Sequence, residues 1–266
     1  MRLLLLATRY SLLATAFVLC TNAALAWGGT GHRVIAALAE ANLSPKAKAT
    51  IEKYLDGQSI VEFASWMDHV RETPEYKYSN GWHTAPVDAK LLHTDSIARK
   101  TGDAITATID SIKTLVDYQK KRPETVALHI KFLVHMIPDF HCPGHVSYSS
   151  ITYSFDITAN GKAVPYHDIW DSHVVDAHKL SLNQWVKRLN TLSVDEIHKI
   201  RAGSPRDWFH QNALDSLVIY KWVKPGAKLN DDKYTDFIAK SRPLTESQMQ
   251  KAGYRLAGVL NALFGR

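Results

Sequence analysis

One stretch of this sequence, Leu133–His145 (LVHMIPDFHCPGH), constrains the fold more than any other because it contains three histidines and one aspartate within eleven residues. His135 and Asp139 are four residues apart, so on a helix their side chains share one face. Pro143–Gly144 then breaks that helix ahead of His145. An imidazole and a carboxylate on one face, followed by an imidazole beyond a turn, are typical of a metal site, although an isolated HxxxD pair also occurs by chance.

The first 26 residues have the composition of a secretory signal peptide. Arg2 and Arg9 make the start positively charged, Ser11–Cys20 is mostly apolar, and Ala24–Ala26 is a small-x-small cleavage site. We therefore expect cleavage after this segment, a mature chain that begins at Trp27, and a secreted or periplasmic location. A membrane anchor is the alternative, but the apolar run is short for a span, so we expect no stable membrane association.

Residues 27–266 have the size and composition of one globular domain, which we expect to be a monomer. Without residues 1–26 the chain has 30 Lys+Arg and 26 Asp+Glu, and this net charge of +4 weakly favours an anionic substrate. Cys142 is then the only cysteine, so no internal disulfide can form. An exported domain without disulfides depends on its core or on bound metal.

The apolar periodicity predicts an all-α fold class, a single mainly helical domain with a small β-hairpin. The expected helices cover 32–42, 45–55, 60–71 (helical or turn-rich), 103–120, 124–141, 167–180, 181–192, a short segment from 193, 204–222, and a last segment capped at 245. Pro138 is expected to kink the helix over 124–141 or to end it near His135. Asn160–Gly161 between two apolar runs predicts the hairpin.

Groups with the chemistry of zinc ligands recur along these helices. Zinc binds imidazole nitrogen and carboxylate oxygen at about 2.0–2.2 Å. The candidates, which include the free amine of the first mature residue, are Trp27, His32, Asp68, His83, His135, Asp139, His145, His167 and Asp171. This set is too large for one metal and sufficient for two or three.

In this order, the residues resemble those of the zinc-dependent, single-strand-specific nucleases of the fungal S1/P1 type, which have secreted plant and bacterial relatives. The matches run from Trp27 to about Val175: W-x4-H (Trp27, His32), D-x-x-R (Asp68, Arg71), W-H (Trp82, His83), H-x3-D-x-H-x-P-x-H (His135 to His145) and H-x3-D (His167, Asp171). Each pair alone is a weak signal, whereas all of them in order, with tryptophan at the expected cleavage point, form a specific one.

The resemblance implies a helical domain built around a trinuclear zinc cluster, with three Zn²⁺ ions per chain. One zinc would be held by Asp68, His83, His135 and Asp139. A close neighbour would be held by Trp27, His32 and Asp139, with Asp139 bridging the two ions. A more distant zinc would be held by His145, His167 and Asp171.

The same resemblance implies a hydrolase of ester bonds, an endonuclease on single-stranded DNA and RNA that is also a 3′-nucleotidase. Paired metals would activate a hydroxide for in-line attack on phosphorus, and the third would stabilise the departing 3′-oxygen, which leaves 5′-phosphorylated products. Arg71 would hold a non-bridging phosphate oxygen, with Asp68 beside it in the catalytic set. A simple helical ion pair is the alternative for Asp68 and Arg71.

The sequence departs from the pattern of that family in three places. Thr84 follows His83 where relatives have an aromatic residue that can stack on a base, Pro138 stands where they have glycine, and the hairpin lacks a G-G-N stretch. Base stacking contributes roughly 1–3 kcal/mol per base, so the metal chemistry is better supported than the substrate. The tyrosines that could replace the missing aromatic residue are Tyr148, Tyr153 and Tyr166.

Two other functions remain open. Zinc-dependent phospholipases C share the fold and the N-terminal tryptophan, but they have glutamate at a metal position where this chain has Asp139 or Asp171. The second is an exported zinc-binding domain without catalysis. Of the residues near the motif, His141 is expected to orient a metal ligand and Cys142 to be a small buried residue.

Overall fold

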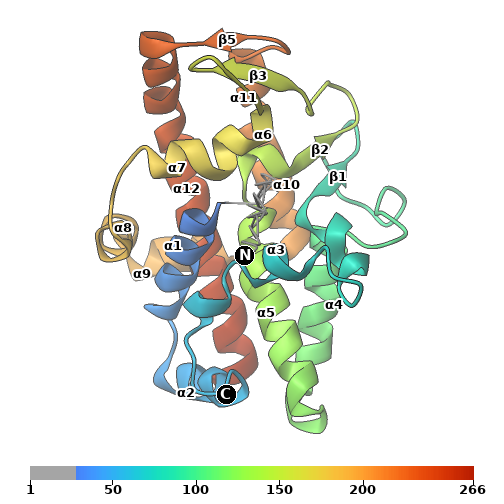
Figure 1. The fold of residues 1–266 in the computed structure, drawn as a ribbon. Helices are drawn as coiled ribbons and strands as arrows, with labels where there is room; N and C mark the ends of the chain where they lie inside the picture. Colours follow the sequence, from blue (N-terminus) through green and yellow to red (C-terminus); the bar gives the residue numbers. More distant parts are fainter. Residues whose placement is uncertain (1–27) are drawn as a thin grey trace, which may run out of the picture.

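The computed structural model describes residues 28–266, so Trp27 and the expected cleavage site lie outside the described residues. Helices dominate this part of the chain, and the strands form only two small sheets (Figure 1), which confirms the all-α fold class. No described helix is both long enough and apolar enough to cross a membrane.

The α-helices are α1 Gly29–Glu40, α2 Pro45–Tyr54, α3 Trp66–Val70, α4 Ala104–Val116, α5 Pro123–Asp139, α6 Tyr166–Asp168, α7 Val174–Asp176, α8 Leu182–Leu189, α9 Val194–Arg201, α10 Pro205–Ser216, α11 Ile219–Trp222 and α12 Asp231–Phe264. Tighter 3-10 turns form η1 Ile60–Phe63, η2 Lys77–His83, η3 Tyr118–Lys120 and η4 Pro143–His145, and a wider π-helical turn forms η5 Ile169–His173. The strands are β1 Ala85–Val87, β2 Val146–Tyr148, β3 Asp156–Ala159, β4 Lys162–Pro165 and β5 Lys228–Leu229.

Helix α5 is the central element of the fold. It contacts α4, α12, α2 and α1, and every residue from Phe132 to its end at Asp139 is buried (Figure 1). Because water cannot reach this part of α5, the polar side chains on it must find partners inside the protein. The candidate ligands His135 and Asp139 are therefore shielded from water by the fold itself.

Pro138 does not end α5 near His135, which was one of the two effects expected of it, and the expected kink stays a prediction. Proline has no N–H to donate to the carbonyl four residues earlier. The helix nevertheless continues to Asp139, and the amide of Phe140 then donates to the carbonyl of Met136 at 3.1 Å. Since the helix is intact over this turn, His135 and Asp139 do share one face.

The expected hairpin is present and belongs to a slightly larger sheet. Strands β3 and β4 pair in antiparallel fashion around Asn160–Gly161, and β5 adds a parallel strand to β3. A second sheet that the sequence did not reveal pairs β1 with β2 in parallel, with Ala85 opposite Val146. Because β1 follows His83 closely and β2 follows His145 directly, this small sheet holds two candidate ligands at one end of the molecule.

The C-terminal helix is longer than the sequence indicated. Helix α12 begins at Asp231, well before Thr245, and continues through Pro243. Thr245 is buried inside the helix, so the prediction that it caps the last helix is wrong. The pattern Thr245-x-x-Gln248 imitates a capping box, and Pro243 just before it imitates a helix start.

Candidate metal centre

Four candidate ligands from three elements meet beside the end of α5. Nδ1 of His83, at the end of η2, lies 3.0 Å from Oδ2 of Asp139 and 3.1 Å from Nε2 of His135. Nε2 of His135 lies 3.2 Å from the same Asp139 oxygen. Oδ1 of Asp68, on α3, lies 3.7 Å from both histidine nitrogens. Tetrahedral zinc with bonds of 2.0–2.1 Å separates its ligand atoms by about 3.3 Å, so the atoms of His83, His135 and Asp139 have the spacing of one zinc site. Asp68 lies slightly farther out and also groups with His32 and His135.

The hydrogen bonding of these four residues is also consistent with a cation-binding site. Both carboxylate oxygens of Asp68 and Nε2 of His83 are buried without a hydrogen-bond partner among residues 28–266. A buried carboxylate without compensation is costly, and a divalent metal would compensate it. Nδ1 of His135 is bonded to the carbonyl of Ala64 at 2.8 Å, which directs Nε2 toward the other ligands.

His32 of α1 faces the other oxygen of Asp139. Its Nε2 lies 3.3 Å from Asp139 Oδ1, and its ring stacks on His135 with the centroids 4.1 Å apart. The two oxygens of one carboxylate thus face two different groups of histidines. This is the arrangement that a bridging aspartate requires, and the prediction that Asp139 bridges two metals stays open on these grounds.

The start of the described chain lies beside the same region. The amide of Gly28 donates to the carbonyl of Asp171 at 2.6 Å. A Cβ on Gly28 would collide with the hydroxyl of Ser172, so a larger residue there would require the Ser172 side chain to move. The predicted ligand Trp27 is outside the described residues, and its role stays a prediction.

The residues predicted for the distant zinc are only partly gathered. Nε2 of His145 lies 3.0 Å from Oδ1 of Asp171. His167 belongs to a neighbouring group with Asp168 and Asp171, and its Nε2 lies 2.9 Å from Oδ1 of Asp168. Asp171 is therefore shared by both groups, and it sits on the π-helical turn η5, a local geometry that often marks functional sites. Gly144 permits the close approach, since a Cβ on it would lie 3.1 Å from Cα of His167.

The histidines differ in their tendency to hold a proton. Burial lowers the pKa of His83, and burial together with His135 lowers the pKa of His32. For His135 and His145 burial acts in the same direction, but the adjacent carboxylates outweigh it and raise the pKa to about 8 and about 9, respectively. Near neutral pH the first two imidazoles are neutral and ready to bind metal, whereas the other two must release a proton first.

Among residues 28–266, His141 contacts none of the predicted ligands through its ring nitrogens. Its Nδ1 donates to the carbonyl of Ile137 at 2.7 Å, and its Nε2 accepts from Nη1 of Arg255 at 2.8 Å. Burial, followed by the charge of Arg255, holds the pKa of His141 well below its usual range. The residue therefore links the end of α5 to α12, which differs from the expectation that it orients a metal ligand.

Cys142 is buried as expected, and it also contacts a candidate ligand. Its Sγ donates to Oδ1 of Asp171 at 2.9 Å. Burial, followed by the charge of Asp171, raises the pKa of the Cys142 thiol well above its usual range. In this protonated form the thiol orients the carboxylate of Asp171, and Cys142 also forms a group with His145 and Asp171 that could hold a metal ion. In the sequence, the one sign that Cys142 lies near metal ligands was its position inside the stretch Leu133–His145.

A cavity of about 350 Å³ opens beside these groups, and Arg71, His83, His145 and Asp171 are part of its wall. Of the three tyrosines considered as stacking residues, only Tyr153 lines this cavity. Tyr148 and Tyr166 are buried, and their hydroxyls donate to main-chain carbonyls. Nη1 of Arg71 lies 3.9 Å from Oδ1 of Asp68, so the two residues of the predicted catalytic pair are close together, and Arg71 is the one that lines the cavity.

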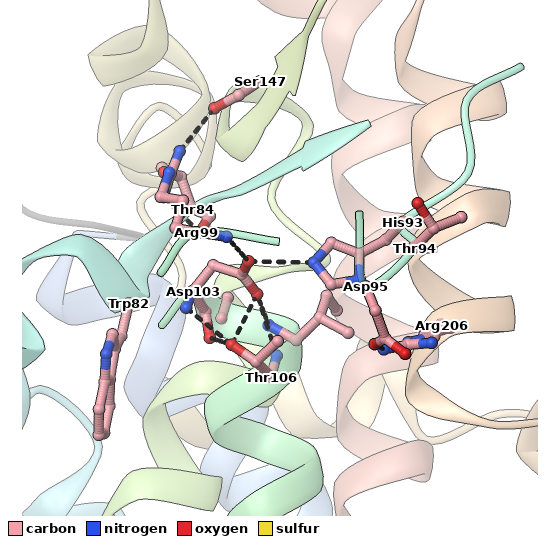
Figure 2. A network of polar contacts seen from close by, with 12 residues as sticks. Trp82, Thr84, His93, Thr94, Asp95, Arg99, Asp103, Thr106, Ser147 and Arg206 are labelled. Carbon is pink, nitrogen blue, oxygen red and sulfur yellow. Dashed lines mark hydrogen bonds and ion pairs between the residues drawn. The ribbon is translucent and has the colours of Figure 1, made fainter. Parts of the chain in front are cut away.

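Arg99 also lines this cavity, and no sequence motif pointed to it. Its Nη1 donates to the carbonyls of Gly81 and Thr84 at 2.8 and 2.9 Å, and its Nη2 donates to Oγ of Ser147 at 3.1 Å (Figure 2). The main-chain amide of Arg99 donates to Asp103, which caps α4 and pairs with the buried His93. This network fixes Arg99 against the loop that presents His83.

The chain was compared with known proteins. The family model described as S1/P1 Nuclease matches residues 27–265. Endonuclease 5 of Arabidopsis thaliana is 25% identical over 290 residues, which cover 91% of this chain and 92% of the relative. Nuclease P1 of Penicillium citrinum is 25% identical (90% and 98% covered), and Nuclease S1 of Aspergillus oryzae is 23% identical (89% and 91% covered).

These matches favour a nuclease over a phospholipase C. The family is zinc-dependent in general and acts on nucleic acid, which accords with the metal-binding geometry beside α5. The protein is thus a hydrolase of phosphodiester bonds that belongs to the S1/P1 nuclease family.

Proposed function

We propose that this protein is a secreted or periplasmic endonuclease and 3′-nucleotidase that acts on single-stranded DNA and RNA and holds three zinc ions. The observation that carries the proposal is the zinc-like spacing of His83, His135 and Asp139 beside Asp68, with His83 also in the wall of a cavity that presents Arg71. Metal ligands and a guanidinium at one cavity are the groups that phosphodiester hydrolysis requires.

The three zinc sites follow from the grouping of the ligands. Asp139 supplies one oxygen to the set with His83 and His135 and its other oxygen to the set with His32. Trp27 completes the second set through its amine and carbonyl once the preceding segment has been removed. The third set is His145, His167 and Asp171, with Asp171 oriented by the thiol of Cys142.

Bound zinc would supply a water of lowered pKa as the nucleophile and would neutralise charge on the phosphate. The residues of the chain then position the substrate. Arg71 binds a non-bridging phosphate oxygen, and the carboxylate of Asp68, whose Oδ1 lies 3.9 Å from Nη1 of Arg71, holds the guanidinium at the cavity wall.

Selectivity for single strands follows from the need to stack a base. Thr84 cannot stack, but Tyr153 lines the same cavity and is available in its place. In a duplex both faces of a base are covered by neighbouring bases, whereas an unpaired base can leave the stack and lie on an aromatic ring.

Mature protein (residues 27–266) loaded with zinc tests the proposal against single-stranded DNA, single-stranded RNA, duplex DNA, a 3′-mononucleotide and phosphatidylcholine. We expect 5′-phosphorylated products from the single strands, phosphate release from the mononucleotide, slower cleavage of the duplex and no lipid hydrolysis. Metal analysis on the same preparation should give three zinc ions per chain. Protein that carries zinc and is inert on every phosphodiester and monoester would overturn the proposal.

A further inference from the structure

We infer that Arg99 forms a second phosphate-binding position in the cavity, which holds the phosphate next to the one that is cleaved. Since a 3′-mononucleotide has no such neighbouring phosphate, the position would favour oligonucleotides among the substrates. The inference rests on the proposed function for its substrate class, but its binding component can be measured independently.

The charge of Arg99 is available to an anion. The three acceptors of its guanidinium are two main-chain carbonyls and the hydroxyl of Ser147, all of them neutral (Figure 2). Among residues 28–266, no carboxylate forms an ion pair with its guanidinium. The neighbouring carboxylate of Asp103 accepts from the main-chain amide of Arg99 and from His93 instead. A positive charge held at a cavity wall by neutral groups attracts a phosphate.

The guanidinium also has donors left to offer. Of its five N–H groups, three make the bonds just described, which leaves the one on Nε and a second one on Nη2. Two donors on one planar guanidinium match two oxygens of one phosphate, the geometry for which arginine is preferred over lysine in phosphate recognition.

The position of Arg99 is fixed before substrate arrives. Asp103 caps α4 through the amides of Ile105 and Thr106 and binds the main chain of Arg99 at the same time. A binding group that is already ordered loses little conformational entropy on binding. Arg71 and Arg99 line one cavity, with Arg71 beside Asp68 and Arg99 beside Thr84 and Ser147. Two guanidinium groups at different parts of the wall suit two successive phosphates of one strand.

A purely structural role is the competing explanation, because Arg99 binds the carbonyls of Gly81 and Thr84 on either side of His83. The two roles predict different results. Loss of a structural brace would displace His83, lower the zinc content and slow all substrates equally. Loss of a phosphate contact would leave zinc unchanged and affect only substrates that have a second phosphate.

The test uses zinc-loaded mature protein as wild type, Arg99→Gln, Arg99→Lys and the control Lys100→Gln, which removes the same charge from the adjacent exposed residue outside the cavity. KM and kcat are measured on a single-stranded oligonucleotide and on a 3′-mononucleotide, together with zinc content. In parallel, the Kd for a cleavage-resistant phosphorothioate oligonucleotide is measured over a range of salt concentrations.

We expect Arg99→Gln to raise KM and Kd for the oligonucleotides about tenfold to a hundredfold and to reduce the salt slope of binding by about one. KM for the mononucleotide and the zinc content should stay within about twofold of wild type, as should every value for Lys100→Gln. Arg99→Lys should recover part of the oligonucleotide affinity.

Equal losses on both substrates, or a fall in zinc content, would overturn the inference in favour of the structural role, and unchanged oligonucleotide affinity would also overturn it. If the wild type cleaves neither substrate, the proposed function fails, and the binding comparison then decides about Arg99 alone. A Kd that is the same for wild type and Arg99→Gln counts against the inference in that case too.

Discussion

Nε2 of His135 lies 3.2 Å from Oδ2 of Asp139, one turn farther along α5. The other oxygen of Asp139 faces His32 at 3.3 Å. One carboxylate therefore contacts two groups of candidate ligands, whereas Asp171 contacts His145 alone among the histidines of the cluster within 3.0 Å. Replacing Asp139 should therefore remove more bound zinc than replacing Asp171.

We predict that Asp139→Asn removes two zinc ions and that Asp171→Asn removes one, because Asp139, unlike Asp171, faces both groups of the paired site. Activity on single-stranded DNA should fall more than about a hundredfold for Asp139→Asn, since changes outside the direct ligands already cost 10–100-fold. Metal analysis of dialysed protein measures the stoichiometry, and the exposed Asp110→Asn serves as the control. The same zinc loss in both variants would show that Asp139 does not bridge.

The third zinc has two possible partners for His145 and Asp171, namely Cys142 and His167. We predict that Cys142→Ser keeps its zinc and that His167→Gln loses one ion, because the Cys142 thiol already donates a hydrogen bond to Oδ1 of Asp171 at 2.9 Å and a serine hydroxyl can make the same contact. Cobalt substitution gives a second readout, since a thiolate ligand adds charge-transfer absorption that an imidazole does not. A thiolate signal, or zinc loss in Cys142→Ser alone, would assign the ligand to Cys142.

The sequence predicted the helices best where local signals are strong. The segment after Ser44–Pro45 and the segment after Asp103 form α2 and α4 close to the expected positions, because a cap and an apolar stripe are both encoded within a few residues. The start of α12 was missed because Thr245 and Gln248 imitate a cap inside a helix that packing holds together. A local sequence pattern alone cannot distinguish a true helix start from a cap-like pattern in the middle of a helix.

The residues of the candidate site also fall into those that a local pattern predicts and those whose position depends on tertiary contacts. The pairs that lie on one short segment, such as His135 with Asp139, were predicted from spacing, and the structure brings them together. Arg99 was missed because its position depends on the carbonyl of Gly81, the carbonyl of Thr84 and the hydroxyl of Ser147, which lie far from it in the sequence. The parallel pairing of β1 with β2 that brings Ser147 there has no local signal either.

A pH dependence of stability follows from Asp103. Its burial raises the pKa, but the hydrogen bonds from His93 and from the amide of Thr106 outweigh this and lower the pKa of Asp103 to about 2. A carboxyl with a depressed folded pKa stabilises the protein above its unfolded pKa of about 3.9, and this contribution is lost as the pH falls through about 2. Its size at neutral pH is on the order of 2 kcal/mol.

We therefore predict that Asp103→Asn lowers the free energy of unfolding by about 2 kcal/mol at neutral pH and that its difference from wild type shrinks between about pH 4 and pH 2. Urea denaturation of both proteins at several pH values measures this, and because both lose zinc in acid, the difference isolates Asp103. The exposed Asp110→Asn is the control and should change stability little at any pH. A difference that stays constant down to pH 2 would contradict the assignment.

The last prediction concerns the start of the mature chain. The amide of Gly28 donates to the carbonyl of Asp171 at 2.6 Å, so the described chain begins beside the candidate metal centre. We propose that the free amine of Trp27 is a zinc ligand, and an amine with a pKa of about 7.7–8.0 must lose its proton to bind metal. One extra residue in front of Trp27 converts this amine into an amide, which cannot serve. The extended form should therefore contain one zinc fewer and cleave single-stranded DNA more slowly, whereas one extra residue after Arg266 should change neither. Equal zinc content and rate in the extended and mature forms would remove Trp27 from the ligand set, and the segment before it would then have no part in controlling activity.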